Sequence, residues 1–62
     1  MRELKNWRII RVQNKQDDLQ FCFDGYVEYG RIITSPIKSI DFSKMIAVTE
    51  KENYILKNAS QN

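Results

Sequence analysis

The sequence predicts an all-β domain, a small antiparallel meander of about five or six strands that forms a curled sheet or an SH3-like barrel. Short runs of β-branched and aromatic residues, turn-forming residues between them and little helical spacing of apolar positions favour this class. The 62 residues suffice for one domain, which we place at residues 1–57, with residues 58–62 as a frayed C-terminal tail. A two-layer α+β arrangement is the alternative.

The first two strands are expected at residues 7–12 and 19–24. The first run is β-branched and aromatic, and its imperfect alternation indicates a bulge near Ile9 and Ile10 or burial of both faces. Ahead of it, a short helical turn over residues 1–6 is an alternative, which Asn6 and Trp7 would end. The second run alternates cleanly, so its apolar side chains share one face: Leu19, Phe21 and Phe23.

A hairpin turn is expected at Asp24-Gly25, because both residues tolerate the positive φ of a two-residue turn. The third strand would then start at Tyr26 and break or bend at Gly30. A looser turn over residues 24–26 is the alternative.

Residues 31–56 are expected to form a bent meander against which the rest of the chain packs. Proline lacks the ladder donor, so the strand at residues 31–34 ends at Ser35-Pro36 and the chain turns a corner there. The apolar phase shifts across this corner, which predicts two buried pairs on opposite sides of it: Ile33 with Ile37, and Ile40 with Phe42. Polar segments predict the remaining turns: residues 14–18, 41–44 and 50–53. The last strands are expected at residues 45–49 and 54–56.

The charge of the chain is mildly basic and unevenly distributed. A formal net charge of +2 is below what is typical of a dedicated DNA-binding protein. Residues 1–16 are basic with Glu3 as their single acid, whereas residues 17–28 carry acids and no base. Pairing of the two segments as neighbouring strands would cancel much of this asymmetry. A functional basic stripe is the alternative.

Catalytic, metal-binding and cofactor-binding motifs are absent from the sequence. Histidine, the commonest general base and metal ligand, is missing, so the single cysteine, Cys22, has no imidazole to activate it. One cysteine also excludes an internal disulfide and a zinc staple. We therefore expect no enzymatic activity, no cofactor and no metal. Cys22 is expected to be a small packed side chain, and Asp17-Asp18 a solvated turn.

A cytoplasmic protein without membrane contact is expected. No apolar run approaches the roughly 20 residues that cross a bilayer. The first residues lack the apolar segment of a signal peptide, and a single thiol suits a reducing compartment.

A binding module that acts through protein–protein contacts is the expected function. The chain holds more large apolar residues than one face of a thin sheet can cover, and open sheets have edges that accept strands. This surplus predicts a homodimer, an inhibitor or an accessory subunit. The alternative is a small nucleic-acid-binding β-barrel that uses the basic and aromatic N-terminal strand.

The candidate contacts for a partner are the aromatic and basic side chains expected at the surface: Trp7, Arg8, Arg11, Tyr26, Tyr29 and Arg31. A chain this short also needs aromatic residues for its core, where these are expected: Trp7, Phe21, Phe23 and Phe42. Trp7 therefore carries two competing expectations, exposure as a contact and burial in the core.

A resemblance covers part of the bent meander. Residues 34–37 read Thr-Ser-Pro-Ile, residues 40–41 Ile-Asp, residues 47–49 Ala-Val-Thr and residues 54–56 Tyr-Ile-Leu. This pattern resembles a C-terminal module of small bacterial and prophage-encoded proteins, in which a short turn follows Val-Thr and precedes an aromatic-x-Leu strand. The turn at residues 50–53 departs from the serine-glycine turn of that pattern. The resemblance implies no activity and a bacterial or phage cytoplasmic origin.

Overall fold

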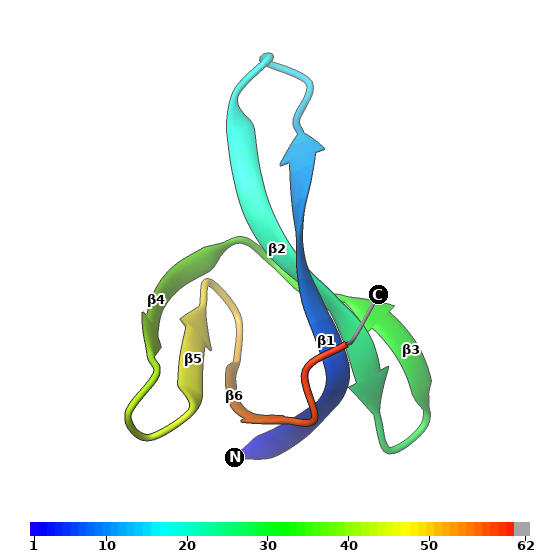
Figure 1. Ribbon diagram of the computed structural model, residues 1–62. Helices are drawn as coiled ribbons and strands as arrows, with labels where there is room; N and C mark the ends of the chain where they lie inside the picture. Colours follow the sequence, from blue (N-terminus) through cyan, green and yellow to red (C-terminus); the bar gives the residue numbers. More distant parts are fainter. Residues whose placement is uncertain (61–62) are drawn as a thin grey trace.

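The computed structural model describes residues 1–60, which form one six-stranded sheet that curls on itself without closing (Figure 1). The strands are β1 (Arg2–Gln13), β2 (Leu19–Val27), β3 (Gly30–Ile33), β4 (Ile37–Asp41), β5 (Ile46–Thr49) and β6 (Asn53–Lys57). Their order is β3-β2-β1-β6-β5-β4, and all neighbours are antiparallel except β1 and β6. The predicted all-β class is confirmed, in its open, curled form.

β1 begins earlier than expected, and its bulge lies elsewhere. Residues 2–5 pair in parallel with β6, which excludes the alternative of a short helical turn there. The register with β2 shifts between Lys5 and Arg8, and not near Ile9-Ile10. Asn6, inside this bulge, has a φ of 49°, a conformation that asparagine tolerates better than most residues.

The β2–β3 hairpin turns later than expected. β2 continues through Asp24-Gly25 to Val27, and the two-residue turn lies at residues 28–29. The expected turn at Asp24-Gly25 and the strand start at Tyr26 are therefore wrong. Gly30 pairs with Val27 and has a φ of 138°, so it is the glycine whose conformational freedom this hairpin uses.

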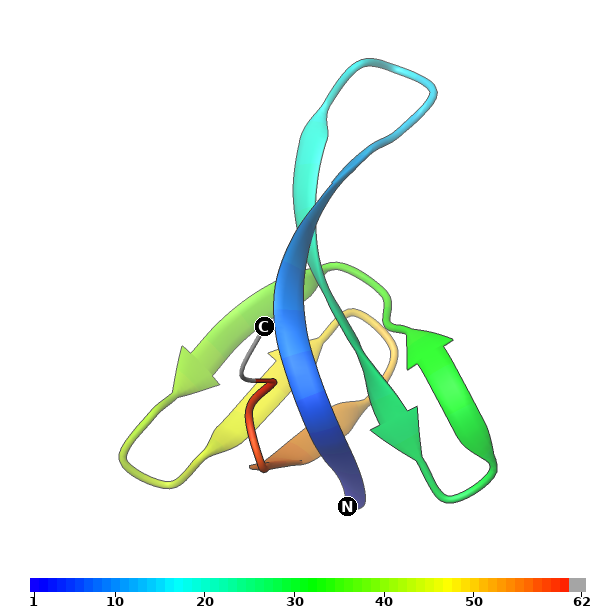
Figure 2. The same cartoon turned by 45° about the vertical axis from the view of Figure 1, so that its right-hand side comes forward.

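The connection between β3 and β4 is a short link that joins the two edge strands of the sheet. These strands stand at opposite ends of the strand order, yet only residues 34–36 join them. The Thr34 N–H donates to the Phe23 carbonyl at 2.9 Å, and Thr34 Oγ1 accepts from the Phe23 N–H at 3.0 Å. On the other side, the Pro36 carbonyl accepts from the Glu50 N–H at 3.0 Å. The link therefore carries the chain from one edge of the open sheet to the other (Figure 2), and the predicted corner at Pro36 is confirmed.

The burial expected around that corner is correct for one residue of each pair. Ile37 and Ile40 pack against the core, but Ile33 is 61% exposed and Phe42 62% exposed. Ile33 lies on the outer face of β3, whereas its neighbour Ile32 packs inward. Phe42 lies in the turn after β4. A register shift between Ile37 and Ser39 explains why both apolar residues of β4 face the same side.

The core lies on the concave face of the curl. Its buried side chains come from β1, β2, β5 and β6: Leu4, Phe23, Val27, Ala47, Tyr54 and Leu56. Trp7 packs edge-on against Phe23, with ring centroids 5.5 Å apart. Its indole N–H is buried and has no hydrogen-bond partner within residues 1–60. Trp7 is thus half-buried and belongs to the core, as does Phe23.

Residues 58–60, expected as part of a frayed tail, lie beside β1. The Ser60 N–H donates to the Trp7 carbonyl at 2.7 Å, which extends the β1–β6 edge past the last paired residue, Lys57. Residues 61–62, the rest of that expected tail, lie outside the described residues.

The substitution Gly25→Ala is expected to destabilise the fold. A Cβ at Gly25 would lie 3.0 Å from Leu4 Cδ1 and 3.1 Å from the Lys5 carbonyl oxygen, so β1 and β2 would have to separate. Overpacking of this kind costs about 1–3 kcal/mol, which urea unfolding measures as a lower midpoint. Ser39→Ala, at an exposed position on β4, is the control. An unchanged midpoint for Gly25→Ala would contradict the close approach.

The substitution Thr34→Val tests the link between the edges. Valine keeps the shape of threonine but removes the acceptor that the Phe23 N–H uses at 3.0 Å. Because this site is buried, the N–H would stay unsatisfied, at a cost of about 1–3 kcal/mol in unfolding free energy. Urea unfolding measures this cost. If Thr34→Val lost no more unfolding free energy than Ser39→Ala, the hydrogen bond would have no structural role.

Candidate functional site

Residues 9–22 of the β1–β2 hairpin extend beyond the curled sheet as an arm (Figure 1). β6 pairs with β1 at residues 2–5, and β3 pairs with β2 at residues 24–27. In the described chain, the strands of the arm are therefore paired with each other, and their outer edges lack a strand neighbour. Such edges are available for pairing with another chain.

The core face of β2 continues along the arm, where it is exposed. Phe23 is fully buried, but the next residues on the same face are not: Phe21 is 52% exposed and Leu19 is 61% exposed. Ile9, which pairs with Phe23 on β1, is 44% exposed. The expected shared face of Leu19, Phe21 and Phe23 thus exists, but the expected burial of Phe21 is wrong, because no second layer of residues 1–60 covers this face of the arm.

The opposite face of the arm is better covered. Cys22 pairs with Ile10 and is 4% exposed, so it is a packed side chain as expected. Burial raises the pKa of its thiol, with a smaller contribution from Glu50 in the same direction. A reactive thiolate is disfavoured in this setting.

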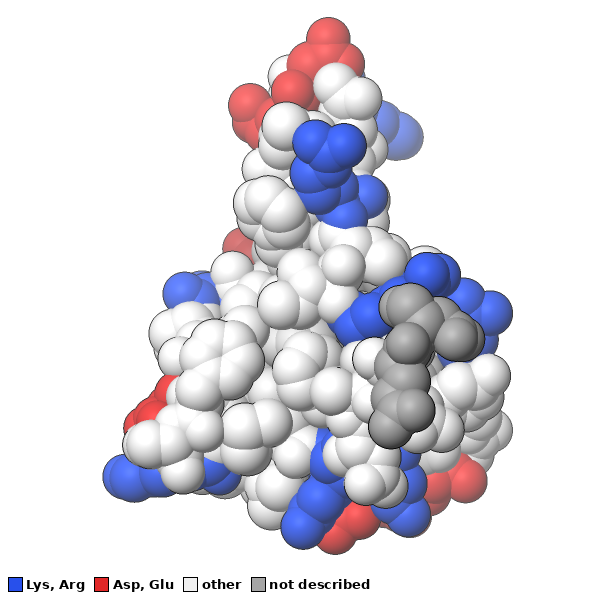
Figure 3. Space-filling view, in the orientation of Figure 1, with Lys and Arg blue, Asp and Glu red and all other residues white. Residues whose placement is uncertain are grey.

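Charges on the arm are ordered along its length. The turn at its tip carries Asp17 and Asp18 together with Lys15, and Arg11 pairs with Phe21 nearer the sheet. Figure 3 shows acidic side chains at the tip, basic side chains below them and uncharged side chains over the centre of this face. The basic and acidic segments lie on neighbouring strands, as expected, because β1 pairs with β2. In the described part of the chain, one ion pair joins the two segments, Arg8 with Asp24.

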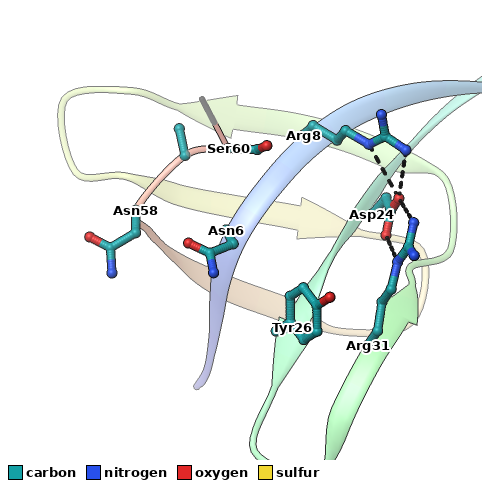
Figure 4. Close-up of a pocket in the computed structure, with 8 residues that line it drawn as sticks. Asn6, Arg8, Asp24, Tyr26, Arg31, Asn58 and Ser60 are labelled. Atoms are coloured by element: carbon teal, nitrogen blue, oxygen red, sulfur yellow. Dashed lines mark hydrogen bonds and ion pairs between the residues drawn. The ribbon is translucent and has the colours of Figure 1, made fainter. Parts of the chain in front are cut away.

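A second feature lies on the convex face, where two arginines hold one carboxylate (Figure 4). Arg31 donates to Asp24 through Nε at 2.8 Å and Nη2 at 2.6 Å, and Arg8 donates to Asp24 Oδ2 through Nε at 3.3 Å and Nη2 at 3.1 Å. Asp24 is 5% exposed, whereas the arginine side chains are 54% and 58% exposed. Hydrogen bonds from Arg31, then those from Arg8, hold the pKa of Asp24 at about 2, although desolvation opposes them. The carboxylate in turn raises the pKa of Arg31.

This cluster forms one wall of an open pocket of about 830 Å³. The other lining residues come from the bulge in β1, from β2 and from the segment after β6: Asn6, Tyr26, Asn58, Ala59 and Ser60. Asn6 and Asn58 both have positive φ, 49° and 50°. The β1 bulge thus shapes this pocket, because it places Asn6 beside Arg8 on the convex face.

The structure brings together half of the contact residues expected from the sequence. Arg8, Tyr26 and Arg31 line the pocket, whereas Trp7 lies against the core. The other two are exposed elsewhere: Arg11 on the arm, and Tyr29 in the β2–β3 turn.

Tyr29 has a contact of its own, with Arg2. The Arg2 guanidinium lies 5.4 Å from the centre of its ring and donates to its hydroxyl at 3.0 Å. Sequence reasoning missed Asp24, Asn6 and Asn58 as members of the pocket. A lone carboxylate between apolar residues of a strand was the available signal for Asp24.

Comparison with known proteins identified no matching family model, curated protein or solved structure. The resemblance of residues 31–56 to a bacterial and prophage module stays a prediction. Residues 1–60 contain no helix of the length and hydrophobicity needed to span a bilayer. Within the same residues, no three acidic or thiol side chains are grouped as metal ligands.

The substitution Asp24→Asn is expected to flatten the acid end of the stability profile. The folded pKa of Asp24 is about 2 and its ordinary value 3.8, so the unfolded chain binds the proton more tightly. The stabilisation is complete above about pH 4 and is lost as the pH falls toward 2. Thermal unfolding of both proteins from neutral to acid pH measures this.

Asp41→Asn provides the comparison for that experiment. The pKa of Asp41 is also lowered, by hydrogen bonds from the Ser43 hydroxyl and the Lys44 and Ser43 N–H groups in the turn after β4. Each variant should lose less unfolding free energy between neutral and acid pH than the unmodified protein does. The two reductions should add in the double variant, because the two sites share no hydrogen-bond partner. If the stability of Asp24→Asn fell with pH as steeply as that of the unmodified protein, the proposed stabilisation of the ionised Asp24 by the two arginines would be wrong.

Proposed function

We propose that the protein is a non-enzymatic binding module that acts through protein–protein contacts, and that its partner is a second copy of the chain, bound through the arm. The observation that carries this proposal is the exposed continuation of the core face: Ile9, Leu19 and Phe21. An isolated two-stranded hairpin is marginally stable in water. A partner that covers this face would supply the second layer that the arm lacks.

The charge order along the arm favours a second copy over an unrelated protein. Arg11 lies two residues from Gln13, and Asp17 lies two residues from Leu19, while Gln13 and Leu19 pair with each other. A two-fold axis through that pair, with the arms antiparallel, places Arg11 of one copy beside Asp17 of the other. Gln13 Nε2 donates to Asp17 Oδ1 at 3.2 Å, which holds this carboxylate near the face of Gln13 and Leu19.

The apolar part of the interface is tested with Phe21→Lys in sedimentation velocity. Two copies of Phe21 would lose about 2 kcal/mol each, so the dimer dissociation constant should rise at least about 100-fold. Phe42→Lys is the matched control, because Phe42 is similarly exposed but lies off the arm. A monomeric unmodified protein at all concentrations, or equal effects of both substitutions, would overturn the proposal. In the first case, the exposed face would belong to a different protein.

The antiparallel arrangement has its own test in a double-mutant cycle. Asp17→Asn keeps a residue type that tolerates the φ of 64° at this position. Asp17→Asn and Arg11→Gln should each weaken the dimer by a few-fold, because an exposed ion pair contributes about 0.2–1 kcal/mol. The double variant should be no weaker than the weaker single variant. Additive effects would mean that these two residues do not meet across the interface.

A further inference from the structure

We propose that the pocket formed by Asn6, Arg8, Asp24, Tyr26, Arg31 and residues 58–60 binds a phosphorylated nucleoside, free or as one unit of a single strand. This site is separate from the arm and does not depend on dimerisation. The phosphate would contact the two arginines, and the base would lie against Tyr26.

The pocket carries a surplus positive charge. Asp24 is the single acid among its described lining residues, and it faces both Arg8 and Arg31. One arginine would suffice to neutralise the buried carboxylate. The second leaves a net charge of about +1 in the pocket, where it attracts an anion.

The arginines are also held ready for a ligand. A guanidinium has five N–H donors, and each arginine directs its Nε and Nη2 toward Asp24. The Nη1 groups remain available, and both side chains are more than half exposed. Because Asp24 fixes the planes of both guanidiniums, little side-chain freedom is left to lose when a phosphate binds.

The rest of the pocket suits a nucleoside better than a bare anion. Tyr26 pairs with Arg31 across β2 and β3, and it is 46% exposed. Figure 4 shows its ring between the arginine cluster and Asn6. An exposed aromatic ring beside arginines is the arrangement on which bases stack.

Two carboxamides stand on the other side of that ring. The Asn6 and Asn58 side chains make no hydrogen bond within the described chain, and an amide presents both a donor and an acceptor to the edge of a base. The pocket volume, about 830 Å³, lies in the range of small-molecule sites, about 300–1,000 Å³.

The test is a titration of ¹⁵N-labelled protein, followed by amide chemical shifts, with four ligands at low salt. These are adenosine monophosphate, uridine monophosphate, inorganic phosphate and a short oligouridylate. Shifts should be confined to the pocket residues, and each nucleotide should bind about tenfold more tightly than inorganic phosphate. Equal affinities for nucleotide and phosphate, or shifts spread over the whole molecule, would overturn the assignment of a nucleoside. The site would be overturned if neither the two nucleotides nor oligouridylate changed any amide chemical shift.

Two variants separate the roles within the pocket. Arg31→Gln should weaken every ligand about tenfold, because it removes one of the two positive charges of the pocket together with its available Nη1 donor. Tyr26→Leu, which keeps an apolar side chain at this half-exposed position, should weaken binding of the nucleotides and leave that of inorganic phosphate unchanged. The matched controls are Lys38→Gln and Tyr29→Leu, a cation and a tyrosine exposed outside the pocket. Equal losses from the controls would contradict the proposal.

The oligonucleotide identifies the source of the ligand. If the natural ligand is a strand, oligouridylate should bind more tightly than uridine monophosphate, with a steeper loss of affinity in added salt. If it is a free nucleotide, the two should bind equally. The pocket does not include the arm, so the two proposals fail separately. If no nucleotide binds, the dimer proposal still stands. If the protein is found to be monomeric, the proposal of a nucleotide site still stands.

Discussion

The hydrogen bonds of residues 34–36 are the constraint on which the rest of the structure depends. A link this short can join the two edge strands only if the sheet curls until the end of β3 lies close to the start of β4. Thr34 holds one edge through Phe23, and Pro36 holds the other through Glu50. The bend creates a concave face that becomes the core, and a convex face that carries the charge cluster. The arm extends beyond this bend, so its apolar face has no cover within the sheet.

The exposed face of the arm is a direct result of this geometry. Leu19, Phe21 and Phe23 follow one alternation, but the concave face ends at Phe23, where the link crosses. A chain of 62 residues has one small core, and the apolar residues that lie beyond it need another cover or remain in water. This is the physical basis for proposing that a partner covers the arm.

The bulge in β1 separates the two candidate surfaces. Its extra residue moves Leu4 and Ile9 onto the concave face although they are an odd number of positions apart, and it puts Arg8 opposite Asp24 on the convex face. The apolar arm face and the charged pocket therefore lie on opposite sides of the same hairpin. The side chains of one surface face away from those of the other, so a substitution in the arm face leaves the contacts of the pocket in place.

The sequence by itself determined the class of the fold, the shared face of Leu19, Phe21 and Phe23, the corner at Pro36 and the polar turns, because these follow from local backbone preference and strand alternation. It also singled out Arg8, Tyr26 and Arg31, but gave no reason to place them together. Gly25 misled the prediction of the hairpin, since a glycine needed for the close approach of Leu4 looks the same in sequence as a glycine needed for a turn. The positions of the bulges, the exposure of Phe21 and Ile33, and the meeting of two arginines at Asp24 were decided by tertiary structure alone. They depend on register and on which strands lie side by side, and pairing between distant segments leaves no local pattern in the chain.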